Sequence, residues 1–71
     1  MIDKNDILEA ITEEQDRKKA KQLLEMYEKG STGSFHTALF DAIRHADNDN
    51  LDRLIKGFPE YVWAYLNRYN S

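Results

Sequence analysis

The amino-acid sequence predicts a compact all-α bundle of four to five short helices. Apolar residues recur at helical spacing along most of the 71 residues, and no stretch has the pattern of a strand. One proline and three glycines stand where helices should begin or end. A chain of this length holds one domain, so residues 1–71 are expected to fold as a unit. The expected helices span residues 3–11, 13–29, 35–46, 50–56 and 59–69.

The first 29 residues carry two apolar faces that point in nearly opposite directions. One face comes before the polar stretch at residues 12–19 and one after it: Ile7, Leu8 and Ile11, then Ala20, Leu23, Leu24 and Tyr27. Thr12 and Gln15 have the spacing of a capping box, which favours a break near Thr12 and a new helix from Glu13. Gly30 is the expected left-handed stop of that helix. One continuous helix that contacts two different partners is the alternative.

The most regular helical pattern lies in residues 35–46. Its apolar positions follow one stripe: Phe35, Ala38, Leu39, Ala42, Ile43 and Ala46. Ser34 is the expected N-cap. Because three residues of the stripe are alanines, another helix could approach closely, and we expect this to be the central helix.

The remaining residues predict two shorter helices. Residues 47–50 offer several N-caps for the first, which Gly57 should end. Pro59 suits the first turn of the second. That last helix has one broad apolar face: Phe58, Tyr61, Val62, Tyr65, Leu66 and Tyr69. Trp63 lies off this face.

The small size of the chain indicates that its core needs support. A domain of this mass hides only about 60% of its unfolded surface on folding. Cysteine is absent, which excludes disulfides and thiolate metal sites. Regular helix packing and self-association are the remaining ways to stabilise the core, and we expect a homodimer or a higher oligomer.

Composition also limits the location and the function classes. No apolar run approaches the roughly 20 residues that span a bilayer, and residues 1–6 are too polar and acidic for a signal peptide. We therefore expect a cytoplasmic protein without a membrane partner.

The net charge of −3 argues against general nucleic-acid binding. A nucleic-acid-binding regulator is the third functional hypothesis, and it needs one exposed basic face made of Arg17, Lys18, Lys19 and Lys21.

No catalytic residue, metal site or cofactor is expected, and the protein is predicted not to be an enzyme. His36 and His45 fall on opposite sides of one helix, so they do not share an ion. Asp41 and His45 stand four residues apart, as a surface pair does. Residues 47–52 resemble the start of a calcium loop, but Asp52 occupies the position that requires glycine, and Phe58 the position of the bidentate acid.

A second functional hypothesis is a small-ligand binder. Gly33 and Ser34 precede a helix, where free backbone amides and the helix dipole favour an anion such as phosphate or a nucleotide. The lysine and the preceding strand of a phosphate-binding loop are both absent.

The aromatic C-terminal segment gives the leading hypothesis. Aromatic side chains dominate the binding energy of protein interfaces because they bring a large contact area at low entropic cost. The candidate interface residues are Tyr61, Trp63, Tyr65 and Tyr69. The sequence thus favours a non-enzymatic protein that acts by protein–protein interaction.

Residues 33–43 (GSFHTALFDAI) and 57–60 (GFPE), with Ala46, Asp47, Asn50 and Leu54 between them, resemble a group of small bacteriophage, prophage and mobile-element proteins. The resemblance covers roughly two fifths of the chain. It implies a bacterial cytoplasm and an accessory role. The partner under the leading hypothesis is a host or phage protein. No catalytic or binding residues carry over from the group.

Overall fold

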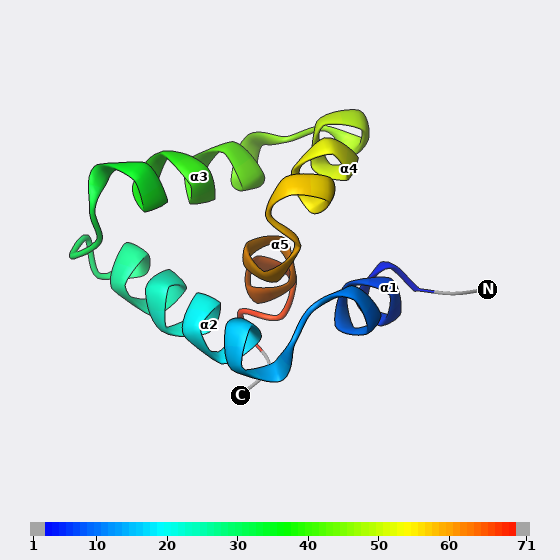
Figure 1. The fold of residues 1–71 in the computed structure, drawn as a ribbon. Coiled ribbons are helices and arrows are strands. Elements are labelled where there is room, and N and C mark those ends of the chain that lie inside the picture. The colour runs from blue at the N-terminus through cyan, green and yellow to red at the C-terminus, as the bar shows by residue number, and fades with distance from the viewer. Residues whose placement is uncertain (1–2, 70–71) are drawn as a thin grey trace.

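The computed structural model describes residues 3–69, which form five α-helices and no strand (Figure 1). The helices are α1 (Lys4–Ile11), α2 (Glu14–Glu28), α3 (Ser34–His45), α4 (Asn48–Gly57) and α5 (Pro59–Leu66). The all-α class is confirmed, and the helices begin and end within three residues of the expected positions. The radius of gyration, 11.5 Å, is close to the roughly 11 Å of a compact domain of this length. Within residues 3–69, no helix is long and apolar enough to cross a membrane.

The break between α1 and α2 is confirmed, but the capping box is wrong. Thr12 and Glu13 are both extended and separate the two helices. The Thr12 hydroxyl donates to the Leu8 carbonyl at 2.5 Å, so Thr12 ends α1 instead of capping α2. Arg17 then donates from Nη1 to the Thr12 carbonyl and hydroxyl oxygens, at 2.7 and 2.9 Å. These bonds engage the Thr12 hydroxyl oxygen, which the predicted capping box would have used as its acceptor.

The other helix ends follow local signals, with one exception. Gly30 has a φ of +74° and stops α2 as expected. Asp47 is the N-cap of α4, where its Oδ1 accepts from the Asn50 amide at 2.8 Å. Pro59 opens α5. The exception is Ser34, which lies inside the first turn of α3, while Gly33 takes the N-cap position without a side-chain bond.

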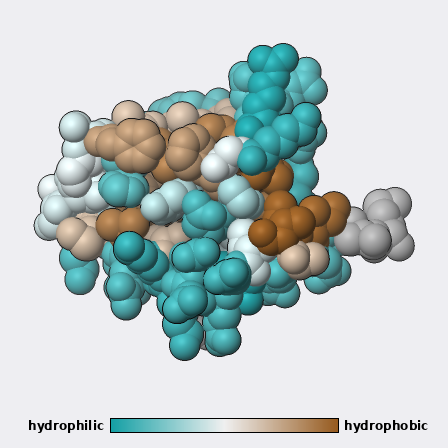
Figure 2. All heavy atoms as spheres, viewed as in Figure 1, coloured by the Kyte–Doolittle hydropathy of each residue, from teal (hydrophilic) through white to brown (hydrophobic). Residues whose placement is uncertain are grey.

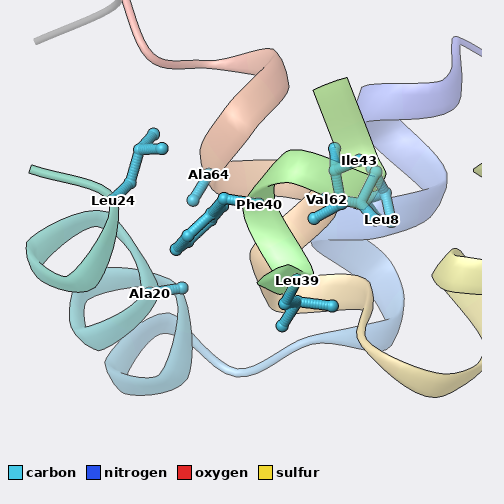
Figure 3. Close-up of a cluster of buried hydrophobic side chains, with 8 residues drawn as sticks. All are labelled: Leu8, Ala20, Leu24, Leu39, Phe40, Ile43, Val62 and Ala64. Atoms are coloured by element: carbon cyan, nitrogen blue, oxygen red, sulfur yellow. The ribbon is translucent and has the colours of Figure 1, made fainter. Parts of the chain in front are cut away.

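Helix α5, and not the predicted α3, is the central helix. It contacts each of the other four helices, and Figure 1 shows it in the middle of the bundle. The buried apolar side chains come from α1, α2, α3 and α5 (Figure 3): Leu8, Ala20, Leu24, Leu39, Phe40, Ile43, Val62 and Ala64. The residues of α5 therefore hold the core together.

The predicted apolar stripe of α3 is only half buried. Leu39 and Ile43 face the core, and so does Phe40, which the stripe did not include. Phe35 is 59% exposed, and Ala38 and Ala42 are also exposed. The helix is turned toward Phe40 because its ring fits between α2 and α5, leaving the alanine side of α3 uncovered.

The buried arc of α5 also differs from the predicted face. Ala64 and Asn67 are buried, whereas Leu66 and Tyr69 are exposed. The Asn67 amide donates to the Trp63 carbonyl at 2.8 Å and to Asn5 Oδ1 at 3.0 Å. A buried polar side chain needs such partners, and these bonds join α1 to the end of α5.

Candidate interaction surfaces

The four predicted interface aromatics do not form one surface. Tyr61 points toward α3, where its ring lies 5.7 Å from Phe40 and 5.6 Å from His36, between centroids. The Tyr61 hydroxyl and His36 Nε2 are 3.4 Å apart. Burial raises the pKa of the Tyr61 hydroxyl, and the carboxylates of Glu60 and Asp16 raise it further. Tyr61 thus contributes to packing within the chain.

Trp63 is held by side chains from α1 and α2. The guanidinium of Arg17 and the ammonium of Lys21 each lie 5.6 Å from its ring centroid, as in cation–π contacts. Its Nε1 donates to Glu9 Oε1 at 3.4 Å. Trp63 packs against the core cluster, which explains its position off the predicted face without a second protein. The residues next to Trp63 in the sequence do not predict these contacts, because its three partners are polar residues far away along the chain.

Tyr65 and Tyr69 come together around Arg68. The Arg68 guanidinium carbon lies 4.0 Å from the Tyr65 ring centroid and 4.7 Å from that of Tyr69. Arg68 Nη1 also donates to the Tyr65 carbonyl at 2.7 Å, which fixes the guanidinium between the rings. Tyr69 is 85% exposed. We call these three residues the tyrosine–arginine stack.

A hollow of about 200 Å³ lies beside the stack. Its walls come from α2, α3 and the end of α5: Leu24, Tyr27, Glu28, Arg44, Tyr65, Arg68 and Tyr69. The Tyr27 hydroxyl donates to Asp41 Oδ1, and this bond raises the pKa of Tyr27, as do burial and the charge of Asp41. Sequence reasoning missed Tyr27, Arg44 and Arg68 as members of a surface, because they are separated along the chain.

A second and larger hollow, the α3–α4 groove, lies between these two helices. It measures about 350 Å³ and is lined mainly by small and apolar residues: Ala42, Ala46, Asn50, Arg53, Leu54, Gly57 and Phe58. The exposed ring of Phe35 lies 6.0 Å from Phe58, between centroids, and extends the apolar surface along α3. Figure 2 shows apolar surface over α3 and separately over α1 on the same face of the molecule.

The histidines and acids do not converge. His36 lies beside Tyr61, and His45 Nδ1 lies 2.9 Å from the backbone oxygen of Asp41. The predicted Asp41–His45 side-chain pair is therefore wrong, because the Asp41 carboxylate accepts from Tyr27 instead. Across residues 3–69, no three histidine or acidic side chains are placed to hold a metal ion.

The other two candidate sites have simple surroundings. Gly33 and Ser34 lie at the first turn of α3, with the exposed Phe35 and the half-buried His36 next to them. The basic run is divided: Arg17 and Lys21 cover Trp63, and Lys18 lies 3.9 Å from Glu14.

No protein-family model, curated protein or solved structure matches this chain. The likeness to phage and mobile-element proteins accordingly stays a prediction.

Proposed function

We propose that this protein is a non-enzymatic, cytoplasmic accessory protein that binds another protein through the tyrosine–arginine stack. The observation that supports this most directly is the placement of Arg68 between Tyr65 and Tyr69. The resemblance of this chain to phage and mobile-element proteins favours a partner from a bacterial host or from the phage itself.

The stack has the composition of an interface hot spot. Tyrosine and arginine are enriched among the residues that carry most of the binding energy. Arg68 is already ordered by its bond to the Tyr65 carbonyl, so little side-chain entropy is lost when a partner binds. Tyr69 presents nearly all of its surface to a partner.

The hollow beside the stack supports a partner segment with both an apolar and a polar group. The Tyr27 ring and the edge of the nearly fully buried Leu24 supply apolar surface, and Arg44 and Arg68 supply N–H donors beside the Glu28 carboxylate. A partner segment that places one apolar side chain in the hollow, with a carboxylate or backbone carbonyl beside it, satisfies both. Arginine forms paired hydrogen bonds with a carboxylate, which would fix the orientation of that segment.

The experiment is quantitative affinity capture from bacterial cytoplasm with the tagged full-length chain. Proteins bound by the wild type are compared by mass spectrometry with those bound by Arg68→Ala and by Tyr69→Ala. We expect both variants to lose the same bound protein, with at least about a tenfold fall in recovery, as removal of a hot-spot side chain predicts.

A matched control separates binding from folding. Met26→Ala removes an exposed apolar side chain from another part of α2, and it should retain the bound protein. Thermal unfolding by circular dichroism checks that all variants are folded. If capture is unchanged by Arg68→Ala and Tyr69→Ala, the proposed surface is wrong.

A further inference from the structure

The α3–α4 groove is an apolar surface that this chain does not cover. Ala42, Leu54 and Phe58 are apolar side chains of its lining, and the exposed Ala38 stands one turn before Ala42 on α3. Alanines let a second helix approach closely, at the short end of the usual 8–10 Å between helix axes. The groove thus has the shape and the chemistry to receive a short amphipathic helix.

The α3–α4 groove carries the positive charge of Arg53 beside its apolar lining. Arg53 is the only charged residue among those that line it, and within residues 3–69 it forms no ion pair. The chain as a whole is acidic, with a net charge of −3. An occupant that carries carboxylates beside its apolar residues would pair with Arg53.

Helix α1 has the complementary surface. Ile7 and Ile11 stand one turn apart and are 46% and 55% exposed, and Ala10 is exposed beside them. The exposed carboxylates of Asp3 and Asp6 flank this face on one side. Helix α1 therefore presents an apolar ridge with acids along its edge, as the groove requires.

The α1 of the same chain is held elsewhere. Leu8 is fully buried in the core, and Lys4 Nζ lies 3.4 Å from Asp52 Oδ1 on α4. Helix α1 is thereby fixed against α5 and α4, while Asn50, Arg53, Leu54 and Gly57 turn the other side of α4 to the groove. The α1 of the same chain therefore does not cover its own groove.

We propose that two copies of this chain form a dimer in which α1 of each copy lies in the α3–α4 groove of the other. Ile7 and Ile11 pack on Ala42, Leu54 and Phe58, and Asp3 or Asp6 pairs with Arg53. A two-fold axis relates the two copies, so the same pair of surfaces meets twice and the assembly closes. Figure 2 shows apolar surface over α3 and over α1 on the same face of the molecule, which suits this arrangement. This inference does not depend on the tyrosine–arginine stack, whose residues take no part in it.

Sedimentation equilibrium of the purified full-length chain tests the dimer over a concentration series. Ile11→Lys places a cation against the apolar lining of the groove, and Ala42→Arg fills the groove with a charged side chain. Both positions are exposed, so both variants should remain folded. We expect each to raise the dimer dissociation constant by more than about tenfold, because a buried unpaired charge is unfavourable.

A mixing experiment distinguishes this arrangement from other dimers. An equimolar mixture of Asp6→Lys and Arg53→Asp sets opposite charges against each other at both contacts of the two-fold dimer, so it should form a heterodimer, whereas each variant alone sets like charges against each other. Met26→Lys, on α2 outside both surfaces, is the control and should dimerise like the wild type.

Three outcomes would overturn the proposal. The first is a wild-type chain that stays monomeric at every concentration. The second is a dimer that Ala42→Arg weakens and Ile11→Lys does not, which would give the groove a different occupant. The third is a dimer unaffected by either substitution. None of these bears on capture of another protein by Arg68 and Tyr69.

Discussion

Helices α5 and α3 are both rich in apolar residues, but they bury them to very different extents. Helix α5 contacts all four other helices and buries Val62 and Ala64, which are two residues apart and point to different sides. Helix α3 packs mainly on α2 and α5, and its other side, with Ala38 and Ala42, stays exposed. The share of a helix surface that is buried therefore depends on how many other helices pack against it.

This difference has a functional consequence. An apolar stripe predicts a helix and its amphipathic character, but it does not specify whether the stripe meets the same chain or another molecule. In α5 the buried apolar residues Val62 and Ala64 are used for folding, and Leu66 is exposed. In α3 Phe35, Ala38 and Ala42 remain exposed, and Ala42 with Ala46 forms one wall of the α3–α4 groove.

Two phenylalanines of α3 give the largest expected contrast. Phe40 is fully buried, and Phe35 is 59% exposed on the same helix. Phe40→Ala should lower the free energy of unfolding by about 3–5 kcal/mol, because it leaves a cavity next to Tyr27 and Tyr61. Phe35→Ala should lower it by less than about 1 kcal/mol, since its ring is mostly in water. Urea denaturation of both variants measures the difference at low protein concentration.

The larger loss approaches the total stability of a domain this small, about 4–10 kcal/mol at typical values per residue. Phe40→Leu is therefore measured beside it, with an expected loss of about 1 kcal/mol. Equal losses for the two alanine variants would mean that α3 has no distinct inner and outer sides.

Local signals in the sequence predicted the helix ends well. Gly30, Asp47 and Pro59 act within one turn of their own positions, through backbone conformation or a single hydrogen bond. The break at Thr12 was also predicted, because two apolar faces on opposite sides do not fit one straight helix packed on one core. The same rules misplaced Ser34 and the capping box, where the chain uses Gly33 and a bond to Leu8 instead.

Contacts between distant segments were not predictable in the same way. Trp63 lies off the apolar face of its own helix, and only the fold brings Glu9, Arg17 and Lys21 to its ring. Of the predicted interface, Tyr65 and Tyr69 meet because of Arg68, which their spacing did not suggest. The candidate surface depends on tertiary packing, and a single sequence holds little information about it.

The N-cap of α4, in the turn between α3 and α4, gives a prediction with an intermediate effect on the free energy of unfolding. Asp47 caps α4, a helix with no buried residue, whereas Ser34 makes no cap bond at the start of α3. Asp47→Ala should lower the free energy of unfolding by about 1 kcal/mol, because the Asn50 amide loses its acceptor. Ser34→Ala is the matched control, and its effect should stay within about 0.5 kcal/mol. A loss for Ser34→Ala as large as that for Asp47→Ala would restore Ser34 as the true cap.

The smallest expected effect concerns the bond that joins α2 to the inner side of α3. The hydrogen bond to Asp41 raises the pKa of Tyr27 above its ordinary value near 10. The stabilisation is complete below about pH 10 and is lost as pH rises through the folded pKa, because the unfolded chain releases this proton first. Wild-type stability should therefore fall in alkaline solution, and Tyr27→Phe should show a shallower fall.

Near neutral pH, Tyr27→Phe should change the free energy of unfolding by no more than about 1 kcal/mol, since the bond is only partly buried. Asp41→Asn provides a second check, because it removes the negative charge but keeps an oxygen acceptor. It should also reduce the alkaline dependence, as measured by thermal unfolding in a series of buffers. Parallel curves for the wild type and both variants would show that this bond contributes nothing to holding α2 on α3, and the packing of Tyr27 on Phe40 would then be the main contact between them.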